Sequence, residues 1–174
     1  KPVIVVLING RPLSITQIQK QVAAIIEAWE PGSFGGQAVA EILFGKVNPS
    51  GKLSISFPRS VGQIPVFYNN KPSQYVRKYL RTSSEPLYTF GYGLSYTSYS
   101  YSTPVLDKSY IGSNEMVTVT VEVTNTGVRE GEEIVQMYLR YPVSDVTRAV
   151  KELRGFRTIS LKAGEKQLVS FVLT

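Results

Sequence analysis

The first third of the chain alternates short apolar runs with polar turns, which is typical of an α/β fold. Residues 3–8 form a continuous apolar, mostly β-branched run, and this predicts a strand buried on both faces, as in a parallel sheet covered by helices on each side. Residues 22–29 form a second apolar run whose length permits a strand or a helix. The Pro-Gly turn that follows, and the strand before it, favour a strand. Between the two runs, residues 14–21 are polar and predict one or two helical turns.

A glycine-rich turn separates the second apolar run from a stretch with helical spacing. From Gly35 to Phe44 apolar residues recur on one side of a helix, and Gly45 is placed to end it. Residues 52–57 then alternate as a strand does. Residues 1–57 therefore predict part of an α/β sandwich. With about three strands they are few for an independent doubly wound domain, and we expect the rest of that domain to precede this chain.

Residues 58–95 form a connector without lasting periodicity. It contains four prolines: Pro58, Pro65, Pro72 and Pro86. A long connector without regular structure is either functional or packed across neighbouring domains. It is also rich in tyrosine and phenylalanine, which argues against a freely solvated linker.

Residues 96–174 have the alternating pattern of an all-β segment. In residues 116–124 valines occupy one face, and threonines with a glutamate occupy the other. Three more stretches predict strands: residues 133–141, 152–161 and 167–173. About five strands are predicted, whereas an immunoglobulin-like or fibronectin type III-like sandwich has ~7. We therefore predict such a sandwich, truncated at its C-terminus.

Composition narrows the chemistry. The chain has no cysteine and no histidine, which excludes disulfides, thiol nucleophiles, Cys or His metal sites and a Ser-His-Asp triad within it. We expect no metal and no cofactor. The net charge is +6, but the basic residues are scattered along the chain, with a modest cluster at Arg77, Lys78 and Arg81. No nucleic-acid partner is therefore predicted. The longest apolar run, residues 3–8, is too short to span a bilayer.

The strand-to-helix turn is the first candidate site, because ligands of parallel sheets usually lie at such turns. Residues 31–36 lack the lysine of a P-loop and the spacing of a dinucleotide fingerprint, so they predict a packing turn rather than a nucleotide site. Glu30 is the best candidate for a general acid because it stands beside an indole. The alternative is a solvated residue near the helix N-terminus. Trp29 could stack on a sugar ring or belong to the core.

Further candidates lie in the connector. Tyr75, Arg77 and Lys78 carry phenol, guanidinium and ammonium groups that could bond sugar hydroxyls, and the alternative is a surface loop packed between domains. Glu27 is expected to form an ion pair at the end of the sheet. Three acidic residues near the second β stretch are expected to be solvated: Glu130, Glu132 and Glu133.

Four segments, in order along the chain, resemble the C-terminal part of family 3 glycoside hydrolases, the β-glucosidase and β-xylosidase group. They are residues 1–13 (KPVIVVLINGRPL), residues 29–45 with 48–53 and 57–60, residues 86–97 (PLYTFGYGLSYT), and residues 153–165. Together they cover nearly the whole chain. One such segment would be weak, whereas four in register are specific.

The resemblance implies a barrel domain, an α/β sandwich and often a fibronectin type III-like domain. This chain would then hold the end of the α/β sandwich (1–57), a connector (58–95) and an incomplete fibronectin type III-like domain (96–174). The family is retaining, with an Asp nucleophile from the barrel and a Glu acid/base from the sandwich, ~5 Å apart. Both are expected upstream, so no catalytic residue is predicted in this chain.

The resemblance also implies the function of the parent protein. It would release terminal β-linked sugars, most often glucose, from non-reducing ends, and would be periplasmic or secreted. This chain would support that site and be inactive alone, with self-association open. The alternative is a non-catalytic module that binds carbohydrate or protein through its β-sandwich. A third option is an adhesive β domain of a cell surface.

Overall fold

The computed structural model describes residues 1–72 and 79–173, which form two compact units. The first unit comprises residues 1–47, most of 53–92, and 141–150. The second comprises residues 48–52, 93–140 and 151–173. Three predicted site residues lie outside the described residues: Tyr75, Arg77 and Lys78.

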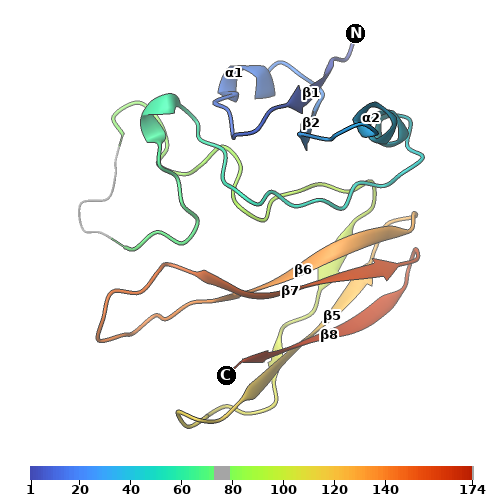
Figure 1. Cartoon of the computed structure of the whole chain (residues 1–174). Helices are drawn as coiled ribbons and strands as arrows, with labels where there is room; N and C mark the ends of the chain where they lie inside the picture. The colour runs from blue at the N-terminus through green and yellow to red at the C-terminus, as the bar shows by residue number, and fades with distance from the viewer. Residues whose placement is uncertain (73–78, 174) are drawn as a thin grey trace. The chain divides into compact units, whose positions relative to one another are not determined.

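The first unit has the predicted α/β character (Figure 1). Its elements are β1 (Ile4–Ile8), α1 (Thr16–Gln19), β2 (Ala24–Trp29) and α2 (Gly35–Leu43). Strands β1 and β2 are parallel, and α2 contacts β2. The strand interpretation of residues 22–29 and the helix after the glycine-rich turn are confirmed.

Burial of β1 on both faces was wrong for this chain. Ile4 is 48% exposed and Ile8 is 68% exposed. The pattern of β-branched residues correctly indicates a strand, but burial needs layers on both sides of the sheet. Within the described residues β1 pairs only with β2, so its apolar side chains are only partly covered.

The predicted strand at residues 52–57 is also wrong. Only Phe57 forms a β-bridge, with Tyr88. Leu53 contributes a second contact, since its N–H donates to the Tyr92 carbonyl and its carbonyl accepts from the Gly91 N–H. Backbone hydrogen bonds are formed at its two ends, and between them the Ser56 hydroxyl accepts from the Phe90 N–H at 3.1 Å, so no regular ladder is formed. Alternation in the sequence reports extended backbone and does not by itself supply a partner strand.

Aromatic residues organise the connector. Phe57 is 2% exposed and lies between Trp29, at 5.9 Å between ring centroids, and Tyr88, at 6.2 Å edge to face. Tyr68 stacks on Phe90 at 4.1 Å. A short 3-10 helix, η1 (Val61–Gln63), is the regular element described in this stretch. Among the described connector residues, Tyr68, Tyr88 and Phe90 pack against other rings, whereas Phe67 is 64% exposed.

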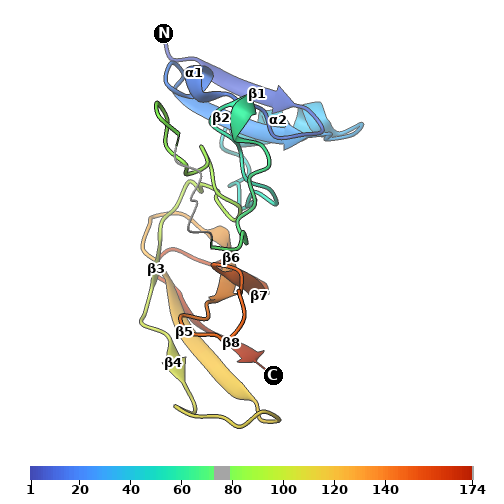
Figure 2. The same cartoon turned by 90° about the vertical axis from the view of Figure 1, so that its left-hand side faces the viewer.

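The second unit is all β (Figures 1 and 2). Its strands are β3 (Tyr99–Tyr101), β4 (Val105–Leu106), β5 (Val117–Asn125), β6 (Gly131–Leu139), β7 (Glu152–Leu161) and β8 (Lys166–Leu173). Strand β5 pairs antiparallel with β3, β4 and β8, whereas β6 and β7 form a second antiparallel sheet. The four long strands match the predicted stretches, and the short β3 and β4 were not predicted individually.

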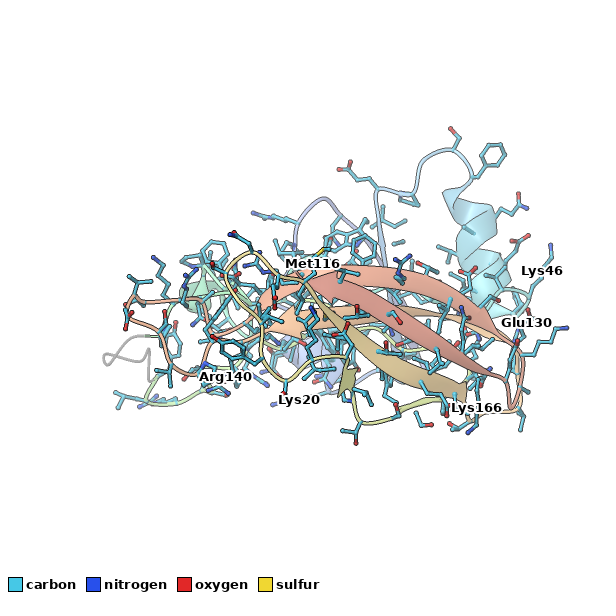
Figure 3. All side chains as sticks on the ribbon, turned by 90° about the horizontal axis from the view of Figure 1, so that it is seen from below. Lys20, Lys46, Met116, Glu130, Arg140 and Lys166 are labelled. Atoms are coloured by element: carbon cyan, nitrogen blue, oxygen red, sulfur yellow. The ribbon has the colours of Figure 1, made fainter. Side chains whose placement is uncertain are left out.

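The core of this unit is built from the inward positions of both sheets. Its buried members are Val121, Val123, Val135, Ile159, Leu161, Val169 and Phe171. Alternation along each strand places these side chains together. The β5–β8 ladder runs from Val117 opposite Leu173 to Thr124 opposite Lys166, so the labelled Met116 and Lys166 mark its two ends in Figure 3.

A buried asparagine closes the turn after β5. Asn125 has no exposed surface. Its side-chain N–H group donates to the carbonyls of Arg129, at 2.8 Å, and Leu161, at 3.0 Å. Its side-chain carbonyl accepts from the Thr97 hydroxyl at 2.7 Å and the Gly127 N–H at 3.1 Å. All the polar capacity of this amide is therefore used, as burial requires.

Candidate functional site

The candidate site lies where β1 and β2 end. Both strands are parallel, so their carboxyl ends meet at one edge of the sheet, which is the usual ligand position in α/β folds. Asn9 follows β1 and Trp29 ends β2. The Asn9 backbone N–H donates to the Trp29 carbonyl at 3.1 Å. This bond brings the two strand ends together beyond the regular ladder.

Strand β2 carries a bulge at this edge. The ladder pairs Leu7 with Glu27 and then Ile8 with Trp29, which leaves Ala28 as an extra residue. Directly after it, Trp29 has a φ of 52°. No other non-glycine residue in the described parts of the chain has a positive φ. Such a conformation is unfavourable for a large side chain and persists only where the surroundings impose it. Bulges commonly re-aim a side chain beside a functional site.

Glu27 is the side chain bonded to this irregular backbone. Its Oε1 accepts from the Trp29 backbone N–H at 3.0 Å. The Asn9 side-chain amide lies 3.3 Å from Oε1 and 3.4 Å from Oε2. Amide N–H groups are the partners of Glu27 among the described residues, where no ion pair with it is found, so its predicted ion pair stays a prediction.

Asn9 completes the contact between the strand ends. Its side-chain carbonyl accepts from the Arg11 backbone N–H at 3.3 Å, which makes a local turn after β1. Its side-chain amide donates to the Glu27 carboxylate, and its backbone N–H donates to the Trp29 carbonyl. One residue thus ties the β1 turn to the bulged end of β2.

Glu30 is exposed on the turn after β2. A Cβ added at Gly10 would lie 2.8 Å from its Oε1, so the Glu30 carboxylate rests against the backbone of the β1 turn. Two carboxylates, Glu27 and Glu30, therefore belong to this edge. They differ in chemistry: the oxygens of Glu27 accept hydrogen bonds from the fold, whereas Glu30 is open to solvent.

The glycine-rich turn serves packing. A Cβ at Gly35 would lie 2.5 Å from Cγ of Pro31, so only glycine permits the proline ring to close on the start of α2. Gly32 has a φ of 67°, a conformation that glycine adopts without penalty. These contacts match the packing role predicted for residues 31–36.

The described residues contain neither a cluster that could hold a metal ion nor a membrane-spanning helix. They contain no group of three or more acidic, His or Cys side chains arranged to hold a metal ion. Among the described helices none is long and apolar enough to cross a bilayer.

A second polar cluster lies in the β unit. Glu133, predicted to be solvated, is only 7% exposed. Its Oε2 accepts from Lys52 Nζ at 2.9 Å, and its Oε1 accepts from the Tyr101 hydroxyl at 2.7 Å. Position 133 shares the inward parity of Val135, so the alternation already placed this carboxylate inward. The lysine that compensates it comes from a distant turn.

Tyr101 responds to this environment. Burial is the largest cause that raises the pKa of the Tyr101 phenol. The hydrogen bond to Glu133 and the negative charge of Glu133 raise this pKa further. A phenolate beside a carboxylate would repel it, so the neutral hydroxyl is retained as a donor. This cluster is a structural network: each of its polar groups is committed to another.

An α/β unit followed by a fibronectin type III-like β unit defines the class of protein. Residues 1–96 match the glycosyl hydrolase family 3 C-terminal domain, and residues 133–174 match a fibronectin type III-like domain. The chain belongs to glycosyl hydrolase family 3.

Named relatives are similar over nearly the whole chain. A periplasmic β-glucosidase of Salmonella typhimurium is 49% identical over 181 residues, which cover 98% of this chain and 24% of the relative. A β-xylosidase of Formosa agariphila is 52% identical over 176 residues, which cover 99% of this chain and 24% of the relative. The chain spans about a quarter of the length of these relatives.

Solved structures agree. A β-glucosidase of Erythrobacter marinus superposes with a TM-score of 0.94 at 46% identity, covering 98% of this chain and 22% of that one. A β-glucosidase of Listeria innocua in complex with glucose superposes with a TM-score of 0.93 at 40% identity, covering 100% and 26%. The predicted family and fold class are confirmed.

Proposed function

We propose that this chain is the C-terminal part of a retaining, exo-acting β-glycosidase, most specifically a β-glucosidase that removes terminal β-D-glucosyl residues. The observation that carries the proposal is the similarity over 98% of this chain to a β-glucosidase of which it covers only 24%. In this proposal the chain ends an α/β sandwich (1–57), crosses a connector (58–95) and contributes a fibronectin type III-like domain (96–174).

The proposed role of the chain is support rather than bond cleavage. Retention requires two carboxyl groups ~5 Å apart on opposite sides of the scissile bond. The carboxylate most firmly placed at the β1–β2 edge, Glu27, accepts hydrogen bonds from the fold, which suits a fixed acceptor better than an acid/base. The nucleophile and the acid/base then lie outside this chain.

Contacts to the sugar from this chain are proposed at the β1–β2 edge and in the connector. Trp29 offers part of an indole face and Glu30 an exposed carboxylate, groups that stack on a pyranose and accept its hydroxyls. Tyr75, Arg77 and Lys78 remain proposed contacts as predicted from the sequence. A periplasmic or secreted location is proposed with them, as the name of the Salmonella typhimurium relative suggests.

The purified 174-residue chain is expected to release no aryl group from an aryl β-glucoside above the uncatalysed rate. The physical reason is that the chain would lack the paired carboxylates of a retaining site. Glu30→Gln, compared in parallel, is expected to change nothing. Turnover by the chain that disappears in Glu30→Gln would contradict the proposal, because it would make Glu30 a catalytic residue.

The alternative is a non-catalytic carbohydrate-binding or protein-binding module. Its support is the exposed aromatic surface of the β unit, which includes Tyr110 at 84% and Tyr101 at 47% exposure. Calorimetric titration with cellobiose separates the two. A binding module gives a saturable isotherm without turnover, whereas a supporting segment gives weak heats that do not saturate.

A further inference from the structure

We propose that Glu27 is a positioning residue that holds Trp29 in its left-handed backbone conformation at the carboxyl end of β2. A role of this indole in sugar binding rests on the proposed function. The positioning itself does not, and it can be tested without any sugar.

Trp29 has an unfavourable backbone conformation. A non-glycine residue at a φ of 52° is disfavoured by roughly tenfold or more relative to ordinary strand backbone. The φ of Trp29 is set by the relative orientation of the peptide planes before and after it. Glu27 Oε1 holds the preceding plane through the Trp29 N–H at 3.0 Å, and the Asn9 N–H holds the following plane through the Trp29 carbonyl at 3.1 Å.

The bulge in β2 displaces the Trp29 N–H from the ladder. Because Ala28 is extra in the ladder, the Trp29 N–H leaves the regular register and needs an acceptor of its own. A carboxylate two residues earlier supplies one. The bond is charge-assisted, which makes it stronger than an amide–carbonyl bond.

Glu27 is itself held in position by Asn9. The Asn9 side-chain amide contacts both of its oxygens, at 3.3 and 3.4 Å. The Asn9 backbone N–H in turn binds the Trp29 carbonyl at 3.1 Å. Trp29 is therefore bonded at both its N–H and its carbonyl, and its ring packs 5.9 Å from Phe57. The indole position follows from these contacts.

The chain offers an unusually direct readout, because Trp29 is its only tryptophan. Every indole signal, whether fluorescence emission, acrylamide quenching or the indole N–H resonance, reports this one residue. Glu27→Ala is expected to move the indole N–H resonance and to accelerate exchange of the Trp29 backbone amide by roughly tenfold or more. Glu27→Gln keeps an acceptor oxygen and is expected to restore most of both signals.

The matched control is Glu41→Ala. Glu41 belongs to the same unit, but its carboxylate bonds Gln37 and Lys46 on and after α2. Its loss is expected to leave the indole signals unchanged. Wild-type indole signals in a folded Glu27→Ala variant, or no recovery in a folded Glu27→Gln variant, would overturn the proposal.

The proposal also has a test that needs no substitution. In the wild-type chain the Trp29 amide proton is expected to exchange at least tenfold more slowly than that of exposed Glu30. Equal rates at the two positions would overturn the positioning by Glu27, whatever the variants do. Failure of the proposed function gives a different result. The chain would then cleave an aryl β-glucoside, while the indole signals would still change in Glu27→Ala and recover in Glu27→Gln.

Discussion

At the scale of single residues, the structure separates carboxylates that look alike in the sequence. Glu27 and Glu133 both stand in apolar strands and both are bonded inside the fold, whereas Glu30 is exposed. A sequence can give the parity of such residues along a strand. It cannot give the donor, because Asn9 and Lys52 reach these carboxylates from elsewhere in the chain.

Tyr101→Phe tests the network around Glu133. The loss of the hydroxyl that donates to Glu133 is expected to cost the β unit about 1 kcal/mol at neutral pH, a modest figure because the residue is half exposed. The loss in the free energy of unfolding would be measured in urea, with exchange of the β5 amide protons as the signal. Tyr110→Phe is a fitting control, since that residue is 84% exposed.

The same variant carries a pH signature. The pKa of Tyr101 is raised in the folded protein, so the folded state keeps the phenol proton at pH values where the unfolded state loses it. This contribution to stability is fully present below the unfolded pKa of about 10 and is lost as the pH rises above it. Wild type is therefore expected to lose more stability than Tyr101→Phe above pH ~10. Parallel pH profiles for the two proteins would contradict this.

At the scale of elements, the turn Asn48–Lys52 belongs to the β unit although it follows α2 in the chain. The Asn48 side-chain carbonyl accepts from the Tyr96 N–H at 2.8 Å and the Ser95 hydroxyl at 2.9 Å. Its amide donates to the Glu130 carbonyl at 3.0 Å. These three hydrogen bonds hold the turn in the β unit.

Asn48→Ala is expected to destabilise the β unit by about 2 kcal/mol, because it removes three hydrogen bonds, those with Ser95, Tyr96 and Glu130. Exposed Asn114, in the turn before β5, gives the matched control, Asn114→Ala, for which a change within ~0.5 kcal/mol is expected. Urea unfolding read by amide exchange in β5 provides both values. Equal stabilities of the two variants would show that the turn contributes nothing to the unit.

At the scale of the whole molecule, apolar exposure is the feature that bears on behaviour in solution. On the first unit Phe34 is 79% and Phe44 89% exposed, and Ile4 and Ile8 of β1 are also open. Exposed apolar groups of this size favour association, because each gains free energy when it leaves water. Self-association of the isolated chain remains a proposal.

The molar mass of the chain is expected to rise above 19.3 kDa as its concentration increases, when measured by light scattering after size exclusion. The double variant Phe34→Ser/Phe44→Ser is expected to shift this rise to higher concentration, because it removes apolar surface from the ends of α2. A constant monomer mass for the wild-type chain would contradict the expectation.

The sequence by itself determined the longer strands and the helices, and the class of fold, although it wrongly predicted a strand at residues 52–57 and did not predict the short β3 and β4 individually. β-Branched runs, the helical spacing after the glycines and the alternation in β5 to β8 are local patterns, and each matches the element observed. The four motif segments determined the family for the same reason, since they are contiguous in the chain. The absence of Cys and His set the limits on chemistry.

Only the tertiary structure decided how these elements are partnered. Residues 52–57 are extended without a full ladder, β1 is only partly covered, and Glu133 finds Lys52 across the chain. The left-handed Trp29 and its bond to Glu27 also belong to this class. Strand pairing and burial depend on residues that are distant in the sequence. Local periodicity does not specify which distant residue contacts a given strand or side chain.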